Sequence, residues 1–189
     1  MKFEKENIRS LLHRYQRKTI ANPLCRRSAV LIPILSVDGV TSLLFTKRTE
    51  TVDHHKGQIS FPGGAEDDRD DSPEATALRE AREEIGLAKE MVDVLGLLHD
   101  LQTPTGFIIT PVVGWIEGNV PLQVNAEEVS ELFTVPLAHF ADLSRRTSRM
   151  FERNGMSIEV FYYDVWREPV WGATANCLKQ LMDLIEGEN

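Results

Sequence analysis

Residues 57–87 read GQISFPGGAEDDRDDSPEATALREAREEIGL, and the second half of this stretch carries the signals of a complete helix. Ser72 suits the N-cap, Pro73 suits the first helical position, and Gly86 stands where a C-terminal cap is expected. Apolar residues recur at steps of three and four, which predicts one face packed against a core. These residues are Ala75, Leu78, Ala81 and Ile85. The sequence therefore predicts an amphipathic helix between Ser72 and Gly86.

Three glutamates lie beside this apolar face at relative positions i, i+3 and i+4: Glu80, Glu83 and Glu84. This spacing places like charges on one helical surface, which costs a few tenths of a kcal/mol in an isolated helix. A hard divalent cation reverses that cost, because Mg²⁺ binds oxygen ligands and often joins carboxylates to substrate phosphates. The preceding FPGG turn, residues 61–64, lets backbone approach a ligand closely. The stretch predicts a metal–phosphate site; the alternative is a solvated acidic helix face.

The same stretch resembles the Nudix box, G-x5-E-x7-R-E-U-x-E-E-x-G-U, in which U is a bulky apolar residue. Residues 79–87 match every fixed position of its second half. In the first half, Gly64 lies one residue too far from Arg79, and the first glutamate position, counted back from Arg79, holds Asp71. A one-residue insertion in the acidic loop 65–71 explains both departures.

The resemblance implies a metal-dependent pyrophosphohydrolase of the Nudix superfamily. Glu80, Glu83, Glu84 and the carbonyl of Gly63 would hold Mg²⁺ or Mn²⁺, which neutralises diphosphate charge and lowers the pKa of bound water. Arg79 would orient the glutamates through charge-assisted hydrogen bonds. The general base would come from this cluster or from a loop glutamate, Glu127 or Glu128, of which we prefer Glu128.

Upstream, the sequence is similar to the coenzyme A pyrophosphatase subfamily, with the pattern L-L-T-x-R-[SA]-x3-R-x3-G-x3-F-P-G-G. Leu43 to Arg48, Gly57 and the FPGG turn carry this similarity. Further stretches that resemble the subfamily are 105–107, 110–114, 133–137 and 171–175. Among the departures, Thr49 replaces Ser or Ala, and Asp53 replaces an arginine that would grip phosphate oxygens. Arg48 or Lys56 is the candidate replacement for that arginine.

The resemblance implies hydrolysis of coenzyme A or an acyl-CoA to phosphopantetheine and adenosine 3′,5′-bisphosphate. Because Asp53 would repel phosphate, ADP-ribose, another nucleotide sugar or a dinucleotide stays open as the substrate. A catalytically silent Nudix module that senses a nucleotide is the alternative of another class. The expected partner is thus a small nucleotide.

Several other residues have a predicted place in or outside this site. The residues expected to bind substrate are Arg48, Lys56, Gly64 and Phe107, and Phe107 either stacks on a base or fills the core. The loop histidines His54 and His55 suit substrate contact better than metal binding. We expect the acidic run 66–71 to be a solvated loop and Trp171 to be buried. Arg145, Arg146 and Arg149 are expected to form a surface cluster.

Composition limits the function classes. The 189 residues fit one domain, 1–189, with a sizeable core. With 29 acidic and 21 basic residues, the formal net charge is -8, which argues against broad binding to nucleic acid or to anionic membranes. Two distant cysteines, a polar N-terminus and no long apolar run predict a reduced, cytoplasmic protein. The sequence leaves monomer and homodimer open.

The remaining patterns predict an α+β fold with a mixed sheet. Helices are expected over 4–17 and 171–186, with a short helix capped by Asn125 between them. Strands are expected over 27–33, 41–47, 92–99 and 107–116, and Pro111 suggests that the last is an edge strand or carries a bulge. Asn154-Gly155 predicts a hairpin between 151–153 and 157–163. The resemblance implies the α/β/α sandwich of the Nudix fold.

Overall fold

A computed structural model describes residues 3–50, 57–118, 120–153, 156–165 and 168–187. Its main sheet is formed by β1 (Arg26–Val37), β2 (Val40–Arg48), β3 (Ile59–Ser60), β4 (Gly63–Ala65), β5 (Val92–Leu97), β6 (Leu101–Gln102), β7 (Phe107–Ile116) and β8 (Val129–Pro136). A second sheet is formed by β9 (Arg146–Arg153), β10 (Met156–Tyr163) and β11 (Val170–Trp171). The helices are α1 (Lys5–Arg14), α2 (Pro73–Ile85) and α3 (Gly172–Glu186), and short 3-10 turns cover Lys89–Met91, Leu137–Ala141 and Leu143–Arg145.

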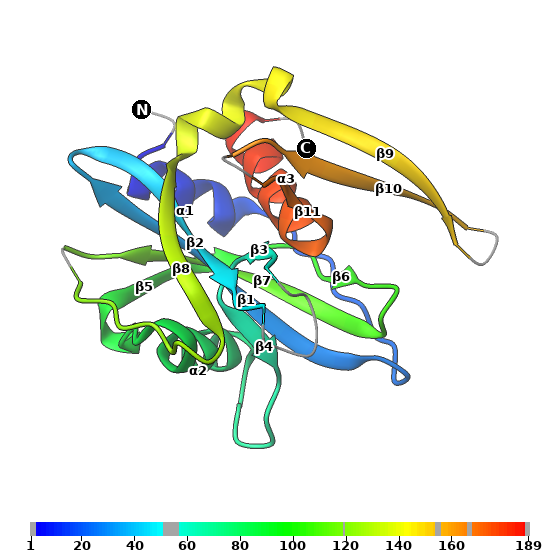
Figure 1. The fold of residues 1–189 in the computed structure, drawn as a ribbon, viewed down its shortest axis with the longest axis horizontal. Coiled ribbons are helices and arrows are strands. Elements are labelled where there is room, and N and C mark those ends of the chain that lie inside the picture. The colour runs from blue at the N-terminus through cyan, green and yellow to red at the C-terminus, as the bar shows by residue number, and fades with distance from the viewer. Residues whose placement is uncertain (1–2, 51–56, 119, 154–155, 166–167, 188–189) are drawn as a thin grey trace.

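The main sheet lies between two helical layers, with α2 on one face and α1 and α3 on the other (Figure 1). Its central pair, β1 and β7, runs parallel, and other pairs in the sheet are antiparallel. Alternation along β1 sends Leu31 into the core beneath α2 and Ile32 into the core beneath α1 and α3. The predicted α+β class and the α/β/α arrangement are both confirmed.

Helix α2 begins and ends as the sequence predicts. The hydroxyl of Ser72 accepts a hydrogen bond from the backbone N–H of Ala75 at 3.1 Å, and Gly86 closes the helix in the left-handed conformation at φ 69°. Its core-facing stripe is turned slightly from the predicted one, because the fully buried alanines are Ala77 and Ala81. Position 84 continues that stripe at the i+7 step from Ala77, so a glutamate falls on the buried side of the helix.

The expected helix after Asn125 is wrong. The side chain of Asn125 does act as a cap, since it accepts from the N–H of Glu127 at 3.1 Å, but it closes a turn. From Val129 the chain continues as β8, which pairs antiparallel with β2. Pairing along a neighbouring strand therefore decides the structure here, whereas a capping residue and apolar spacing fit a turn or a helix equally well.

Pro111 lies inside the sheet, so the edge-strand alternative is wrong, whereas the pairing of β7 with β5 does have a register irregularity, between Val94 and Gly96. On one side Pro111 pairs with Val30 of β1, and on the other its carbonyl accepts from the N–H of Leu98 at 3.0 Å. Leu98 lies between β5 and β6, where the neighbouring strand is interrupted. The proline nitrogen, which has no hydrogen, faces the same interruption, and this explains why the central strand tolerates it.

Several boundaries and one burial differ from expectation. Helix α1 ends at Arg14, and β5 ends at Leu97. Strands β9 and β10 confirm the predicted hairpin, whose Asn154-Gly155 turn lies outside the described residues. Trp171 is 41% exposed and stacks on Tyr162, so its predicted burial is wrong.

The basic cluster is engaged by its neighbours. Arg145 pairs with Asp142, Arg146 lies 3.8 Å from Asp183, and the guanidinium of Arg149 lies 5.3 Å from the ring centroid of Tyr162.

Among the described helices, none is long and apolar enough to cross a membrane.

Asp100 ties the segment after α1 to the sheet, and we expect Asp100→Asn to lower the free energy of unfolding by about 3 kcal/mol. One carboxylate oxygen accepts from Arg17 at 2.7 Å and from the hydroxyl of Thr110 at 2.8 Å, and the other accepts from the N–H of Ile20 at 2.9 Å. An asparagine must turn its NH₂ group toward one of these donors. Urea unfolding measures the loss, with the exposed Glu90→Gln as the control that should change little.

Candidate metal-binding active site

The FPGG turn is held against both the sheet and helix α2. Strand β4 pairs with β1, so that Gly63 lies opposite Val30 and Gly64 opposite Ala29. A Cβ added at Gly63 would lie 2.4 Å from the carbonyl oxygen of Ala29, and one added at Gly64 would lie 2.4 Å from the carboxyl carbon of Glu80. Neither position has room for a side chain, and the turn therefore brings its backbone directly beside the first glutamate.

Gly64→Ala is expected to displace the Glu80 carboxylate while leaving the fold intact, because the group it meets is the end of a side chain. We expect turnover to fall about tenfold to a hundredfold, with an unfolding free energy close to that of the wild type. The matched variant Gly63→Ala meets backbone atoms instead and should lose stability. A folded Gly64→Ala protein with the same turnover as the wild type would contradict this prediction, because it would mean that displacing the Glu80 carboxylate does not affect catalysis.

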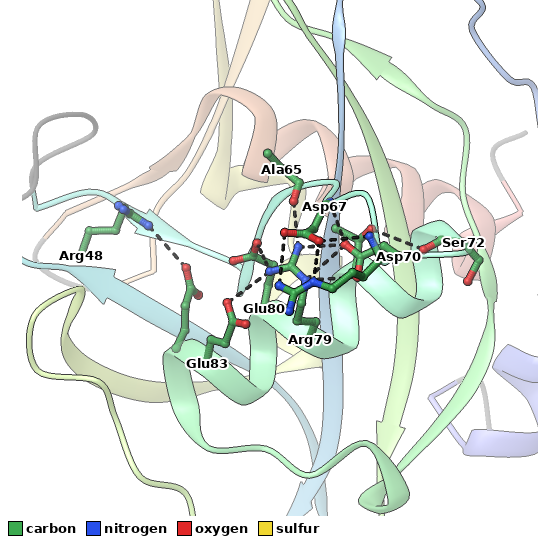
Figure 2. Close-up of polar contacts among 11 residues, drawn as sticks. Arg48, Ala65, Asp67, Asp70, Ser72, Arg79, Glu80 and Glu83 are labelled. Carbon is green, nitrogen blue, oxygen red and sulfur yellow. Dashed lines mark hydrogen bonds and ion pairs between the residues drawn. The ribbon is translucent and has the colours of Figure 1, made fainter.

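Arg79 is the centre of the contacts on the exposed side of α2 (Figure 2). Its guanidinium donates to Glu80 at 2.8 Å, to Glu83 at 3.1 Å and to the carbonyl of Ala65 at 2.8 Å, and it reaches Asp70 at 2.9 Å. Hydrogen bonds from Arg79 hold the pKa of Asp70 below its usual range. Arg79 thus contacts Glu80 and Glu83, and its role in orienting them stays a prediction.

Asp70 is the site residue that the sequence analysis missed. Its side chain is 5% exposed in the ion pair with Arg79, whereas the neighbouring Asp71 is exposed. The expectation of a solvated loop over 66–71 is therefore wrong at this position. Counting forward from Gly64 in the G-x5-E pattern arrives at Asp70, whereas counting back from Arg79 arrives at Asp71. The extra residue thus lies between Asp70 and Arg79, and the forward count was the signal available in the sequence.

Glu84 is the most buried of the three glutamates, with a side chain 4% exposed. Burial raises the pKa of its carboxyl to about 8; the positive charge of Arg48 opposes this shift, and the negative charges of Glu80 and Glu128 add to it. Arg48 Nη1 lies 3.4 Å from Glu84 Oε1. Arg48, a predicted substrate residue, thus lies at the glutamate cluster, although its strand β2 is far from α2 in the sequence.

The loop before β8 brings Glu128 to the same cluster. The N–H of Asn125 donates to the carbonyl of Glu84 at 2.8 Å, and its side-chain amide lies 3.3 Å from Glu128 Oε1. Burial raises the pKa of Glu80; Arg79 opposes this shift, while Glu83 and Glu128 add to it. Glu127 is exposed. The site therefore combines Glu80, Glu84 and Glu128 as carboxylates within electrostatic reach of one another.

The donor set fits a hard divalent cation. The cluster has five acidic side chains and two guanidinium groups, so it holds more negative than positive charge. The acidic residues are Asp70, Glu80, Glu83, Glu84 and Glu128, and the guanidinium groups belong to Arg48 and Arg79. Among the described residues, no three acidic, histidine or cysteine side chains are already gathered for a metal ion. Arg79 contacts Glu83, and Arg48 contacts Glu84. Oxygen ligands with excess negative charge are those that Mg²⁺ and Mn²⁺ bind.

One predicted substrate residue, Phe107, stands apart from this cluster. Phe107 is half-buried at the start of β7, where the guanidinium of Arg26 lies 5.7 Å from its ring centroid, and it belongs to neither core cluster. Lys56 falls outside the described residues, as do Asp53, His54 and His55.

Comparisons with known proteins agree with this geometry. A protein-family model described as the NUDIX domain matches residues 26–153, which include the FPGG turn and α2. "Uncharacterized Nudix hydrolase NudL" of Yersinia pestis (strain Pestoides F) is 41% identical over 156 residues, covering 82% of this chain and 78% of that protein. The protein of that name from Yersinia pseudotuberculosis serotype O:1b (strain IP 31758) matches equally.

Two solved structures share the fold. A Nudix hydrolase from M. Smegmatis, RenU, superposes with a TM-score of 0.52 at 25% identity, covering 62% of this chain and 74% of its own. A MutT/nudix family protein from Enterococcus faecalis superposes with a TM-score of 0.57 at 14% identity, covering 97% and 70%.

Proposed function

The chain belongs to the Nudix family, and from this premise we propose that its substrate is coenzyme A or an acyl-CoA. As a Nudix pyrophosphohydrolase, it acts on nucleoside diphosphate derivatives. The proposed reaction cleaves the diphosphate bond of coenzyme A to give phosphopantetheine and adenosine 3′,5′-bisphosphate.

The observation that carries the coenzyme A proposal is the position of Arg48. This arginine belongs to the upstream pattern that resembles the coenzyme A pyrophosphatases, and its side chain lies against Glu84 of the Nudix helix. Its backbone N–H donates to Gln58, and β2 pairs with β3 immediately before the FPGG turn. The upstream pattern and the glutamate helix therefore form one site, as recognition of a diphosphate beside a cation requires.

Residues of the cluster have distinct proposed roles. Glu80, Glu83, Glu84 and the Gly63 carbonyl would hold Mg²⁺ or Mn²⁺, and the ion supplies charge neutralisation and a more acidic water. Arg79 positions Glu80 and Glu83, and Asp70 positions Arg79. Glu128 is the proposed general base, because the amide of Asn125 orients its carboxylate beside the buried glutamates.

A hydrolysis panel tests the choice of substrate. The purified protein is incubated with Mg²⁺ and then with Mn²⁺, and kcat/KM is measured for coenzyme A, acetyl-CoA, ADP-ribose, other nucleotide sugars and dinucleoside polyphosphates. The proposal predicts the highest kcat/KM for coenzyme A or its acyl derivative. A higher value for a nucleotide sugar or a dinucleotide would reassign the pocket, and binding of nucleotides with no turnover would favour a silent sensor.

A further inference from the structure

A bulge in the main sheet lies beside Arg48. The pairing of β2 with β8 runs in register up to Lys47 and Glu131, but Arg48 then pairs with Val129, leaving Ser130 as the extra residue. The Ser130 hydroxyl stabilises this irregularity, since it lies 3.0 Å from the carbonyl oxygen of Lys47 and 3.2 Å from that of Arg48. Bulges occur next to active sites, and this one lies opposite Arg48, whose guanidinium contacts Glu84.

The two arginines of the site are held very differently. The guanidinium of Arg79 makes contacts of 2.8 to 3.2 Å with Asp70, Glu80, Glu83 and the carbonyl of Ala65. Among the described residues, the guanidinium of Arg48 has one contact, which is longer, at 3.4 Å to Glu84. Within the described part of the chain, its buried Nε has no hydrogen-bond partner. A buried donor without an acceptor is unfavourable, so Arg48 retains capacity for a further acceptor.

The acceptor that matches this capacity is the substrate. A guanidinium presents five donors in a fork that fits phosphate oxygens. A cation on Glu84 would compete with Arg48 for the same carboxylate and would repel the guanidinium. When the cation occupies the Glu84 carboxylate, the Arg48 guanidinium needs another acceptor. A phosphate group bound beside that cation can accept hydrogen bonds from both Nε and the terminal nitrogens.

We propose that Arg48 is an exchangeable counter-ion, which pairs with Glu84 when that carboxylate is ionised in the metal-free protein and moves to the substrate diphosphate when a divalent cation binds Glu84. This inference rests on the proposed function, because it takes Glu84 as a metal ligand. Under this proposal, Arg48 weakens the binding of the divalent cation and strengthens the binding of the diphosphate, so both affinities depend on one side chain.

Cation binding in the absence of nucleotide tests the first half. Mg²⁺ is titrated into the wild type and Arg48→Gln by calorimetry at a series of pH values above 8, because loss of the Arg48 charge leaves the pKa of Glu84 higher and protons then compete with Mg²⁺. Removing the competing charge should tighten Mg²⁺ binding about fivefold or more, and Arg48→Lys should stay near the wild type. Lys47→Gln is the matched control, because this substitution removes the same charge from the neighbouring position, where Lys47 pairs with Glu168 and not with Glu84. Unchanged or weaker Mg²⁺ binding in Arg48→Gln would show that Arg48 merely supports Glu84.

Diphosphate binding tests the second half. With Mg²⁺ saturating, ADP should bind Arg48→Gln about tenfold more weakly than the wild type, and Arg48→Lys should recover part of the loss. Equal binding by the wild type and Arg48→Gln, or binding by neither, would contradict the diphosphate contact. ADP is the probe because it carries the diphosphate of any nucleotide substrate. A wild type that leaves coenzyme A intact would overturn the proposed function alone, since both titrations remain readable.

Discussion

Glu84→Gln is expected to lower turnover by about three orders of magnitude while the protein stays folded. The substitution keeps the shape of the side chain but removes the charge from the most buried carboxylate of the cluster. Glu83→Gln should also lower turnover strongly, although Glu83 is 55% exposed in its pair with Arg79. Steady-state rates with Mg²⁺ and circular dichroism of each variant measure the two quantities. Rates near the wild type in both variants would remove the proposed role of the glutamates.

The same substitution has a predicted effect on stability. The pKa of Glu84 is raised to about 8 in the folded protein from an ordinary value of 4.5. Between these values the native state holds a proton that the unfolded chain has released, so this group makes the free energy of unfolding fall as pH rises. Glu84→Gln lacks the titrating group and should show a smaller fall between about pH 5 and pH 8.

Urea unfolding of the metal-free proteins at several pH values measures this difference. Mg²⁺ should raise the Tm of the wild type more near pH 8 than near pH 5, because a cation requires the ionised carboxylate. Parallel pH profiles for the wild type and Glu84→Gln would contradict the burial of a protonated Glu84.

Asp70→Asn is expected to reduce both stability and turnover, because it breaks the buried pair that fixes Arg79. The loss of one partner from a buried ion pair destabilises by about 3 kcal/mol. We expect turnover to fall about a hundredfold, since Arg79 then no longer holds Glu80 and Glu83 in place. Asp71→Asn is the matched control, with the same chemical change one residue away at an exposed position.

Urea unfolding and steady-state kinetics on this pair locate the inserted residue of the acidic loop. A large effect of Asp71→Asn with little effect of Asp70→Asn would mean that Asp71, and not Asp70, occupies the first glutamate position of the Nudix box. Equal effects in both variants would contradict the buried pair between Asp70 and Arg79.

Local signals in the sequence were sufficient for α2. Its cap at Ser72, its proline at the first turn and its closing Gly86 all act within the helix itself, and the structure has each of them. The spacing of Glu80, Glu83 and Glu84 follows directly once that helix exists. The hairpin strands β1 and β2 were predictable for the same reason, because the turn at Asp38-Gly39 separates two apolar runs.

Features that depend on distant partners were not predictable. Strand β8 is selected by pairing with β2, although Asn125 and the apolar spacing after it fit a helix. Pro111 is tolerated because the strand beside it is interrupted at Leu98. The contact of Arg48 with Glu84 joins β2 to α2, and the bulge beside Arg48 forms between strands about eighty residues apart in sequence. In each case the deciding contact lies outside any local window of sequence.

Product analysis of one reaction tests the proposed activity most directly. The wild type is incubated with coenzyme A, with Mg²⁺ in one sample and a chelator in the other, and the products are identified by mass spectrometry. We predict phosphopantetheine and adenosine 3′,5′-bisphosphate in equal amounts with Mg²⁺, and intact coenzyme A with the chelator. Intact coenzyme A in both samples, or cleavage that does not need the cation, would contradict metal-dependent hydrolysis of this substrate.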